Sequence, residues 1–279
     1  MNVKQHSYHP QRDFSLAADV YGDSAQPAVV LSHGGGQTRH SWRGTANQLA
    51  ERGWYVVSYD HRGHGDSDWS TDGAYSLATY AADQRHVAQS LGQPPVLVGA
   101  SLGGLSALLA HGEAEAPLYR AIILVDIVPQ MDTRGALEIM AFMEATVSEG
   151  FATLDDAADA IAHYTGREKR VSPQGLKKNL RMAKDGRYRW HWDPAIMELR
   201  DDVTSNPERL VEATRNVGVP IMLVRGRESN VVTEEAARQF LALVPEARYV
   251  DVADAHHMVA GDRNDVFTEA VIDFMGTLS

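Results

Sequence analysis

One nine-residue stretch, residues 96–104, restricts the possible folds of this chain more than any other. It reads Val-Leu-Val-Gly-Ala-Ser-Leu-Gly-Gly, and an Ala- and Leu-rich segment with helical spacing follows over 105–110. The pattern predicts a strand, a sharp turn and a helix, because Gly99 and Gly103 carry no Cβ where the backbone is pinched. Such a turn lifts the hydroxyl of Ser101 above the edge of a sheet and directs a helix N-terminus towards it.

The same alternation of strand and helix recurs along the chain. Strands are expected over 14–21, 28–32, 54–59, 96–100, 119–125, 220–224 and 247–252, and helices over 41–52, 76–91, 234–243 and 265–275. This order implies a mainly parallel sheet with helices on both faces. Ligands bind such sheets at the carboxyl ends of the strands, so the loops that follow the strands are expected to share one rim.

The alternation is interrupted between the strands that end at 125 and begin at 220. Helical patterns rich in Met and Ala occur there over 136–148, 154–164 and 173–183, and a Trp-rich loop follows over 187–194. No strand pattern is recognised in this block. We therefore expect a helical cap, 130–207, inserted into a core domain made of 1–129 and 208–279.

Composition excludes several classes of function. The net charge of the 279-residue chain is −11, which disfavours nucleic acid and anionic membrane surfaces as partners. The absence of cysteine excludes disulfides, a thiolate nucleophile and cysteine-based zinc sites. No run approaches the roughly 18 apolar residues of a membrane span, and the N-terminus lacks the apolar centre of a signal peptide. We expect a cytoplasmic protein that acts on a small molecule, and the sequence leaves its oligomeric state open.

A catalytic serine needs a base, and the base needs an orienting carboxylate. The segment Asp-Ala-His-His-Met at 254–258 follows the last expected strand, where a histidine can reach Ser101 from above the sheet. Of its two histidines, His256 and His257, we choose His257 as the base. The alternative interpretation is a solvated loop histidine.

Together these motifs resemble those of the α/β-hydrolases. The match comprises His33-Gly34 after the third strand, the Asp-x-Arg-Gly-x-Gly-x-Ser loop at 60–67 after the fourth, the serine turn after the fifth, and His257 after the eighth. The resemblance is greatest to the capped branch, which holds esterases, lactonases, C–C bond hydrolases, epoxide hydrolases and cofactor-free haloperoxidases. It implies a mainly parallel eight-stranded sheet flanked by helices, with a helical cap inserted after strand six, and no cofactor.

The resemblance also implies where substrate is bound. The family builds its oxyanion hole from two backbone amides, which here are those of Gly35 and Leu102. The candidates for contact with the substrate are Gly34, Trp42, Trp190 and Trp192. For Trp42 the alternative is packing in a helix core, and for the other two tryptophans it is anchoring of the cap on the sheet domain.

The acid of the triad is the open question. The family most often places an aspartate after the seventh strand, where this chain has Asn230, and an amide cannot stabilise the imidazolium by charge. Asp126, after the sixth strand, is our first choice, since some family members, including certain haloalkane dehalogenases, carry their acid there. Glu228 is the alternative acid, and Asn230 or no residue is the third option. Asp126 also fits a structural role, as a cap on the turn that leaves the sheet.

The loop after the fourth strand is expected to be structural. We expect Asp60 and Arg62 to tie it down through hydrogen bonds and a salt bridge. His61, His64 and Asp66 lie close in sequence, but their spacing does not match a His-x-His-x-Asp-His metal motif. The sequence therefore predicts no metal site.

The type of nucleophile narrows the reaction. A serine at position 101 argues against epoxide hydrolysis and dehalogenation, which need a carboxylate nucleophile. We therefore predict a serine hydrolase that cleaves a carboxylic ester or lactone of a mainly apolar small molecule through an acyl-enzyme. Hydrolysis of a C–C or amide bond and cofactor-free perhydrolysis stay open, as does a non-catalytic small-molecule-binding protein on the same fold.

Overall fold

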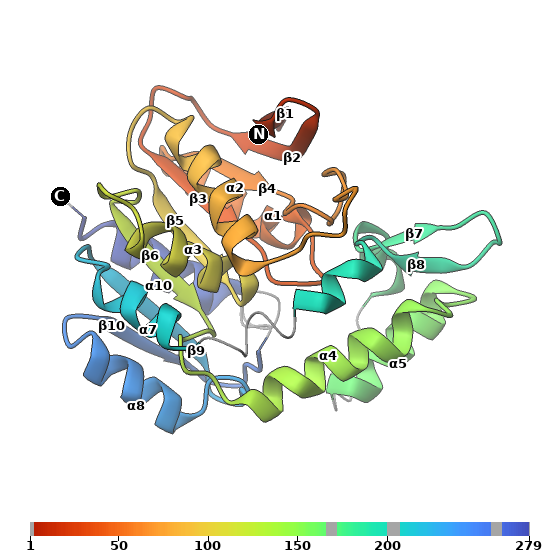
Figure 1. Cartoon of the computed structure of the whole chain (residues 1–279). Coiled ribbons are helices and arrows are strands. Elements are labelled where there is room, and N and C mark those ends of the chain that lie inside the picture. The colour runs from red at the N-terminus through yellow and green to blue at the C-terminus, as the bar shows by residue number, and fades with distance from the viewer. Residues whose placement is uncertain (1–2, 166–171, 200–206, 258–263, 279) are drawn as a thin grey trace.

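A mixed sheet of eight strands forms the centre of the computed structural model, which describes residues 3–165, 172–199, 207–257 and 264–278. The strands are β1 (Lys4–Gln11), β2 (Phe14–Tyr21), β3 (Ala28–Ser32), β4 (Tyr55–Tyr59), β5 (Val96–Ala100), β6 (Ala121–Val125), β9 (Ile221–Gly226) and β10 (Arg248–Val252). Their order across the sheet is β1-β2-β4-β3-β5-β6-β9-β10 (Figure 1). The β1–β2 and β2–β4 pairs are antiparallel, and every pair from β4 to β10 is parallel. The predicted fold class is confirmed.

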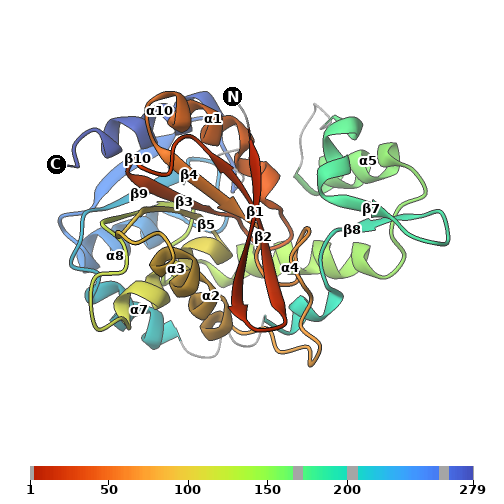
Figure 2. The same cartoon turned by 90° about the horizontal axis from the view of Figure 1, so that it is seen from above.

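Helices cover both faces of this sheet. They are α1 (Arg43–Glu51), α2 (Leu77–Gln89), α3 (Leu102–Gly112), α7 (Pro207–Arg215), α8 (Glu234–Leu243) and α10 (Asn264–Met275). Figures 1 and 2 show α2, α3 and α7 on one face, and α1 and α10 on the other. Within β5, Leu97 packs into the core beneath α2 and α3, whereas Val96 and Val98 pack towards α1 and α10. Both faces of the strand are buried, which explains its continuous apolar run.

The edge strand β1 was not among the strands that the residue pattern predicted. Only Tyr8 of its eight side chains is buried, and the strand pairs with a single neighbour, β2. A strand that faces solvent on nearly every side has no apolar periodicity, so its sequence does not distinguish it from a polar loop.

The segment between β6 and β9 stands over one end of the sheet, and we call residues 133–198 of it the cap segment. It consists of α4 (Thr133–Val147), α5 (Leu154–Thr165), the 3₁₀ helices η2 (Pro173–Lys178) and η3 (Pro194–Glu198), and the strands β7 (Leu180–Met182) and β8 (Tyr188–Trp190). Figure 2 shows α5, β7 and β8 to one side of the sheet, with α4 leading back to it. None of the helices in the described ranges is long and apolar enough to cross a lipid bilayer.

The cap segment corrects two expectations from the sequence. The helix expected over 173–183 is a short 3₁₀ helix followed by β7, and the expected Trp-rich loop contains β8. β7 and β8 form an antiparallel hairpin that turns at Gly186, whose φ is +80°. The Asp185-Gly186 pair is a hairpin signal that identifies this turn in the sequence.

The turn between β5 and α3 is packed without room for side chains at its glycines. A Cβ on Gly99 would lie 2.7 Å from the carbonyl oxygen of Gly103, and a Cβ on Gly103 would lie 2.4 Å from the carbonyl oxygen of Ser32. Both distances are to backbone atoms, which cannot rotate away. The glycines therefore allow α3 to begin directly against β3 and β5.

Replacement of Gly103 by alanine should lower the free energy of unfolding by about 2 to 4 kcal/mol, because its Cβ would push α3 away from β3. Urea unfolding followed by circular dichroism measures the change. The matched control is Gly175→Ala on η2, where the nearest atom would lie 3.6 Å from the new Cβ. We expect the control to change stability by less than about 1 kcal/mol. Equal stability of both variants would contradict this account of the turn.

Candidate active site

Ser101 lies at the tip of the turn between β5 and α3. Its φ of 46° and ψ of −117° are rare for a residue with a Cβ, and such strain persists only where the surrounding structure enforces it. The Ser101 carbonyl accepts hydrogen bonds from the amides of Gly104 at 2.9 Å and Leu105 at 3.0 Å, which start α3. The serine side chain is thus held at the positive end of a helix dipole.

His257 and Asp126 are joined by a hydrogen bond. Asp126 follows β6, His257 follows β10, and His257 Nδ1 donates to Asp126 Oδ2 at 2.8 Å. Asp126 is completely buried, and it also accepts from the Gly226 amide at 2.8 Å and the Ser229 hydroxyl at 2.5 Å. Three donors compensate for the removal of a carboxylate from water. Of the acids that the sequence raised, Asp126 is the one placed against His257.

Asn230 and Glu228 make different contacts. Both are exposed on the loop after β9, and both line the same cavity as His257. Asn230 Nδ2 donates to Oε2 of Glu138 on α4 at 2.6 Å. A Cβ on Gly135 of α4 would lie 2.1 Å from the Asn230 carbonyl oxygen, so the helix is pressed against this loop. The residue at the usual acid position therefore joins the cap segment to the core.

Ser229 is a residue of the site that the sequence did not single out. Its hydroxyl donates to Asp126 Oδ2, and its oxygen accepts from the amides of Val231 and Val232 at 3.1 and 3.2 Å. The side chain thereby fixes both the carboxylate and the loop that carries Asn230. No local pattern marks this serine, because its partner is 103 residues away in the chain.

The loop after β3 approaches the serine closely. A Cβ on Gly34 would lie 3.3 Å from the Ser101 Cβ, and a Cβ on Gly35 would lie 4.0 Å from Leu102 Cδ2. The two residues whose amides were expected to form the oxyanion hole, Gly35 and Leu102, thus lie together, and both line the cavity beside Ser101. Their proximity to Ser101 is compatible with an oxyanion hole built from these two residues.

Three buried histidines, His33, His61 and His64, stabilise the loop after β3 through hydrogen bonds. His33 Nδ1 donates to the Gly34 carbonyl at 2.8 Å, and His33 Nε2 accepts from the His61 amide at 3.0 Å. His64 Nδ1 lies 3.0 Å from the Arg62 carbonyl, to which it donates, and its Nε2 accepts from the Gly36 amide at 3.1 Å. In both His33 and His64 one ring nitrogen donates and the other accepts, so the neutral ring is required.

Burial lowers the pKa of all three histidines. It lowers the pKa of His33 to about 4 and that of His64 to about 3, and it holds the pKa of His61 well below its usual range. The nearby histidines lower the pKa of His61 further by mutual repulsion. The folded protein therefore keeps these rings neutral at every pH above about 4.

The free energy of unfolding should consequently fall as the pH drops below about 6.5, the usual histidine pKa. The unfolded chain takes up a proton on each histidine there while the folded chain does not, so each contributes a loss of about 1.4 kcal/mol per pH unit. For His64 this window extends down to about pH 3. Urea unfolding at several pH values between about 7.5 and 5 measures the slope.

The control for this prediction is His64→Gln, whose amide oxygen can still accept the Gly36 amide. The free energy of unfolding of this variant should change less steeply with pH than that of the wild type, by about 1.4 kcal/mol per pH unit. Contributions from carboxylates are common to both proteins and cancel in the difference. Parallel slopes would show that His64 is not kept neutral by the fold.

The loop after β4 is fixed by ion pairs, with partners that the sequence did not identify. Asp60 accepts from the backbone amide and the guanidinium of Arg39, and Arg62 forms a two-bond pair with Asp83 on α2 at 2.6 and 2.6 Å. Asp60 and Arg62 thus hold the loop through separate pairs. Among the residues that the structure describes, no group of three or more His, Asp or Glu side chains could hold a metal ion.

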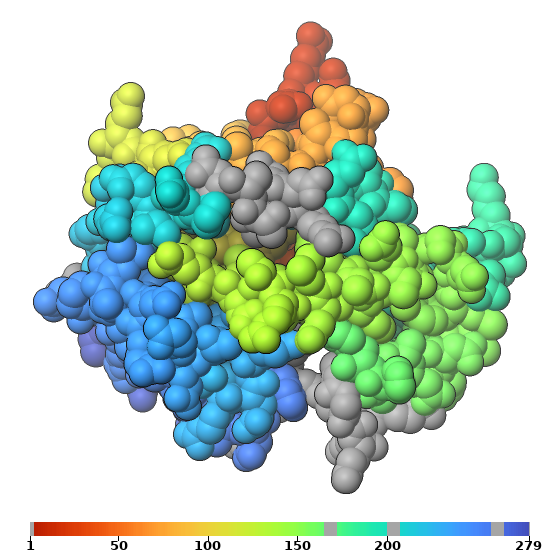
Figure 3. Space-filling view, turned by 60° about the horizontal axis from the view of Figure 1, so that its bottom comes forward, coloured from red at the N-terminus to blue at the C-terminus, as the bar shows by residue number. Residues whose placement is uncertain are grey.

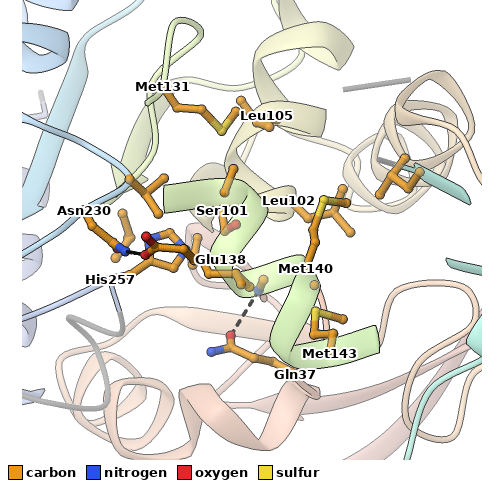
Figure 4. A pocket seen from close by; sticks show the side chains of 18 of the residues that line it. Gln37, Ser101, Leu102, Leu105, Met131, Glu138, Met140, Met143, Asn230 and His257 are labelled. Atoms are coloured by element: carbon orange, nitrogen blue, oxygen red, sulfur yellow. Dashed lines mark hydrogen bonds between the residues drawn. The ribbon is translucent and has the colours of Figure 1, made fainter. Parts of the chain in front are cut away.

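A cavity of about 760 Å³ brings these residues together. Figure 4 shows Ser101 and His257 in it with Leu102, Leu105, Met131, Met140 and Met143. The rim of the sheet supplies one wall and α4 another, and Figure 3 shows α4 across the middle of this face of the molecule. Unbranched methionine side chains make such a wall adaptable to substrates of different shape.

The expected substrate contacts divide into two groups. Gly34 and Trp42 line the cavity, whereas Trp190 and Trp192 are not part of its lining. Trp190 Nε1 donates to Thr146 of α4 at 2.8 Å, and its ring meets Phe151 edge-on. Trp192 is buried at 2% exposure in the core of the sheet domain. Of the two interpretations left open by the sequence, contact with the substrate is therefore not met by either tryptophan: Trp190 packs within the cap segment, and Trp192 packs the cap segment against the core of the sheet domain.

Comparison with known proteins identifies the family of this chain. Residues 27–263 match the family described as alpha/beta hydrolase fold. The chain belongs to the α/β-hydrolase family. As an α/β-hydrolase it is similar to the esterase Rv0045c of Mycobacterium tuberculosis, with 29% identity over 94% of this chain and 87% of the relative. It is also similar to the sn-1-specific diacylglycerol lipase ABHD11 of Mus musculus, with 27% identity over 91% and 82%.

Solved structures show the same α/β-hydrolase fold. The crystal structure of E-2-(acetamidomethylene)succinate hydrolase has a TM-score of 0.86, 22% identity and coverage of 99% of this chain and 100% of that one. A structure of the M. tuberculosis esterase Rv0045c has a TM-score of 0.76 and 26% identity, covering 99% and 92%. These relatives are hydrolases, which supports hydrolase activity for this chain.

Proposed function

We propose that this α/β-hydrolase is a serine hydrolase that cleaves a carboxylic ester or lactone of a mainly apolar small molecule. The observation that carries the proposal is the arrangement of Ser101 and the Asp126-bound His257 in one cavity with largely apolar walls. An esterase and a lipase among the relatives support an ester as the bond that is cleaved.

The arrangement supports a two-step mechanism. His257 takes the proton of the Ser101 hydroxyl as the oxygen attacks the carbonyl carbon, and the buried Asp126 carboxylate stabilises the imidazolium. The negative oxygen of the tetrahedral intermediate accepts hydrogen bonds from the Gly35 and Leu102 amides, each of which contributes on the order of 3 kcal/mol to lowering the barrier. His257 returns the proton to the departing alcohol, which leaves an acyl-enzyme. A water molecule deprotonated by His257 then releases the acid and restores Ser101.

The first test of this function is hydrolysis of p-nitrophenyl butyrate. We expect the wild type to release p-nitrophenol and Ser101→Ala to lose at least about 10³-fold in kcat, because the acyl-enzyme cannot form. A fluorophosphonate should add covalently to the wild type and not to the variant, as mass spectrometry would show. A wild type that neither turns over nor becomes labelled would favour the alternative of a non-catalytic binding protein.

The second test concerns the acid. Asp126→Asn should lower kcat on the same ester by about 10³ to 10⁴-fold, since the amide leaves the imidazolium without a compensating charge. Glu228→Gln should lower kcat by less than about tenfold, because Glu228 lies outside the His257–Asp126 pair. The assignment would be reversed if Glu228→Gln were the more damaging change.

A further inference from the structure

Two carboxylates interrupt the apolar wall of the cavity. Glu138 projects from α4, and Glu228 lies on the loop after β9. Figure 4 shows Glu138 beside Asn230 on the side of the cavity where Ser101 and His257 lie. The proposed reaction does not require either glutamate, and the bond between Asn230 and Glu138 does not require a charge, because a glutamine oxygen would accept it as well.

The Glu138 carboxylate is fixed on the cavity wall. Glu138 is an exposed residue, and its Oε2 accepts the 2.6 Å hydrogen bond from Asn230, which restricts the orientation of its side chain. Its negative charge acts on the neighbouring wall: the pKa of Tyr164, which also lines the cavity, is raised to about 12, first by burial and then by Glu138. Glu138 therefore presents an oriented negative charge to whatever enters.

Two arginines lie near these glutamates, and neither lines the cavity. Arg134, one turn before Glu138, pairs with Asp132 at 3.2 Å and also interacts with the charge of Glu138. Arg227, beside Glu228, pairs at 3.0 Å with Asp251, which also pairs with Arg225. Both Arg134 and Arg227 are more than half exposed, so water screens their charges. Among the cavity-lining residues that the structure describes, none is lysine or arginine. The net charge of the whole chain is −11, which adds to the negative electrostatic potential at the cavity.

We propose that Glu138 and Glu228 select substrates by charge, so that esters bearing a cationic group are favoured over neutral isosteres and esters bearing a carboxylate are disfavoured. This inference rests on the proposed ester hydrolysis. A positive group in the cavity is attracted by both carboxylates, whereas a negative group is repelled by them and loses its hydration against methionine side chains. The substrate class is thus an apolar ester with a neutral or, preferably, ammonium-bearing alcohol or acyl part.

The test compares three butyrate esters of similar size. Choline butyrate is cationic, 3,3-dimethylbutyl butyrate replaces its nitrogen by carbon, and the butyrate ester of 4-hydroxybutanoate is anionic. kcat/KM is measured at about pH 8, where histidines of ordinary pKa are neutral, and at about 10 and 500 mM salt. At low salt we expect the choline ester to exceed the neutral ester by about tenfold and the anionic ester to fall about tenfold below it, with both differences shrinking at high salt.

Substitutions of single glutamates test which residues cause the preference for the cationic ester. Glu138→Gln removes the charge and keeps an oxygen that accepts from Asn230, so the ratio of choline to neutral ester should fall about threefold. Glu228→Gln should lower the ratio by a similar factor. Glu144→Gln is the matched control, because Glu144 is an exposed glutamate of α4 outside the cavity lining, and its ratio should equal that of the wild type.

Three results separate the inference from the proposed function. Equal kcat/KM for the three esters would overturn charge selection while leaving ester hydrolysis standing. An identical ratio in Glu138→Gln, Glu228→Gln and Glu144→Gln would overturn the assignment to the cavity glutamates. Failure to hydrolyse any of the three esters, together with no fluorophosphonate adduct, would overturn the proposed function and this inference with it.

Discussion

The buried carboxylate of Asp126 is the group on which the rest of the site depends. It accepts from His257 after β10 and from Gly226 and Ser229 at the end of β9, so a single side chain links the ends of three strands. Without those donors a charge at zero exposure would be strongly unfavourable. The same contacts that stabilise the charge therefore also set the position of the histidine.

Most of the sheet could be predicted from the sequence because of how it is buried. Strands such as β5 and β6 face two cores, so their side chains form continuous apolar runs. β1 and the β7–β8 hairpin lack this signal, since they lie at an edge or outside the sheet, and the sequence did not predict them. The hairpin depends on Asp185-Gly186, a local turn signal that apolar periodicity alone does not detect.

The site was predictable to the extent that it is local. Ser101 is marked by its own turn, and His257 by the motif after the last strand. Asp126 was chosen from the resemblance to other family members, because its contact with His257 spans 131 residues and depends on how three loops converge. The Asn230–Glu138 bond and the Ser229 hydroxyl also join distant segments, and nothing in the sequence around them reports these partners.

The contact between Gly135 and the Asn230 carbonyl limits where the cap segment can be exchanged for that of another protein. A cap is often regarded as an exchangeable module bounded by the two strands that it connects. Here the first turns of α4 press on the loop that holds Asp126, and a Cβ at position 135 would meet the Asn230 oxygen at 2.1 Å. The start of α4 therefore packs as part of the core. A transplanted cap that begins after Glu138 would keep the native contacts of α4 with the loop that holds Asp126. A cap joined directly after β6 would replace those contacts.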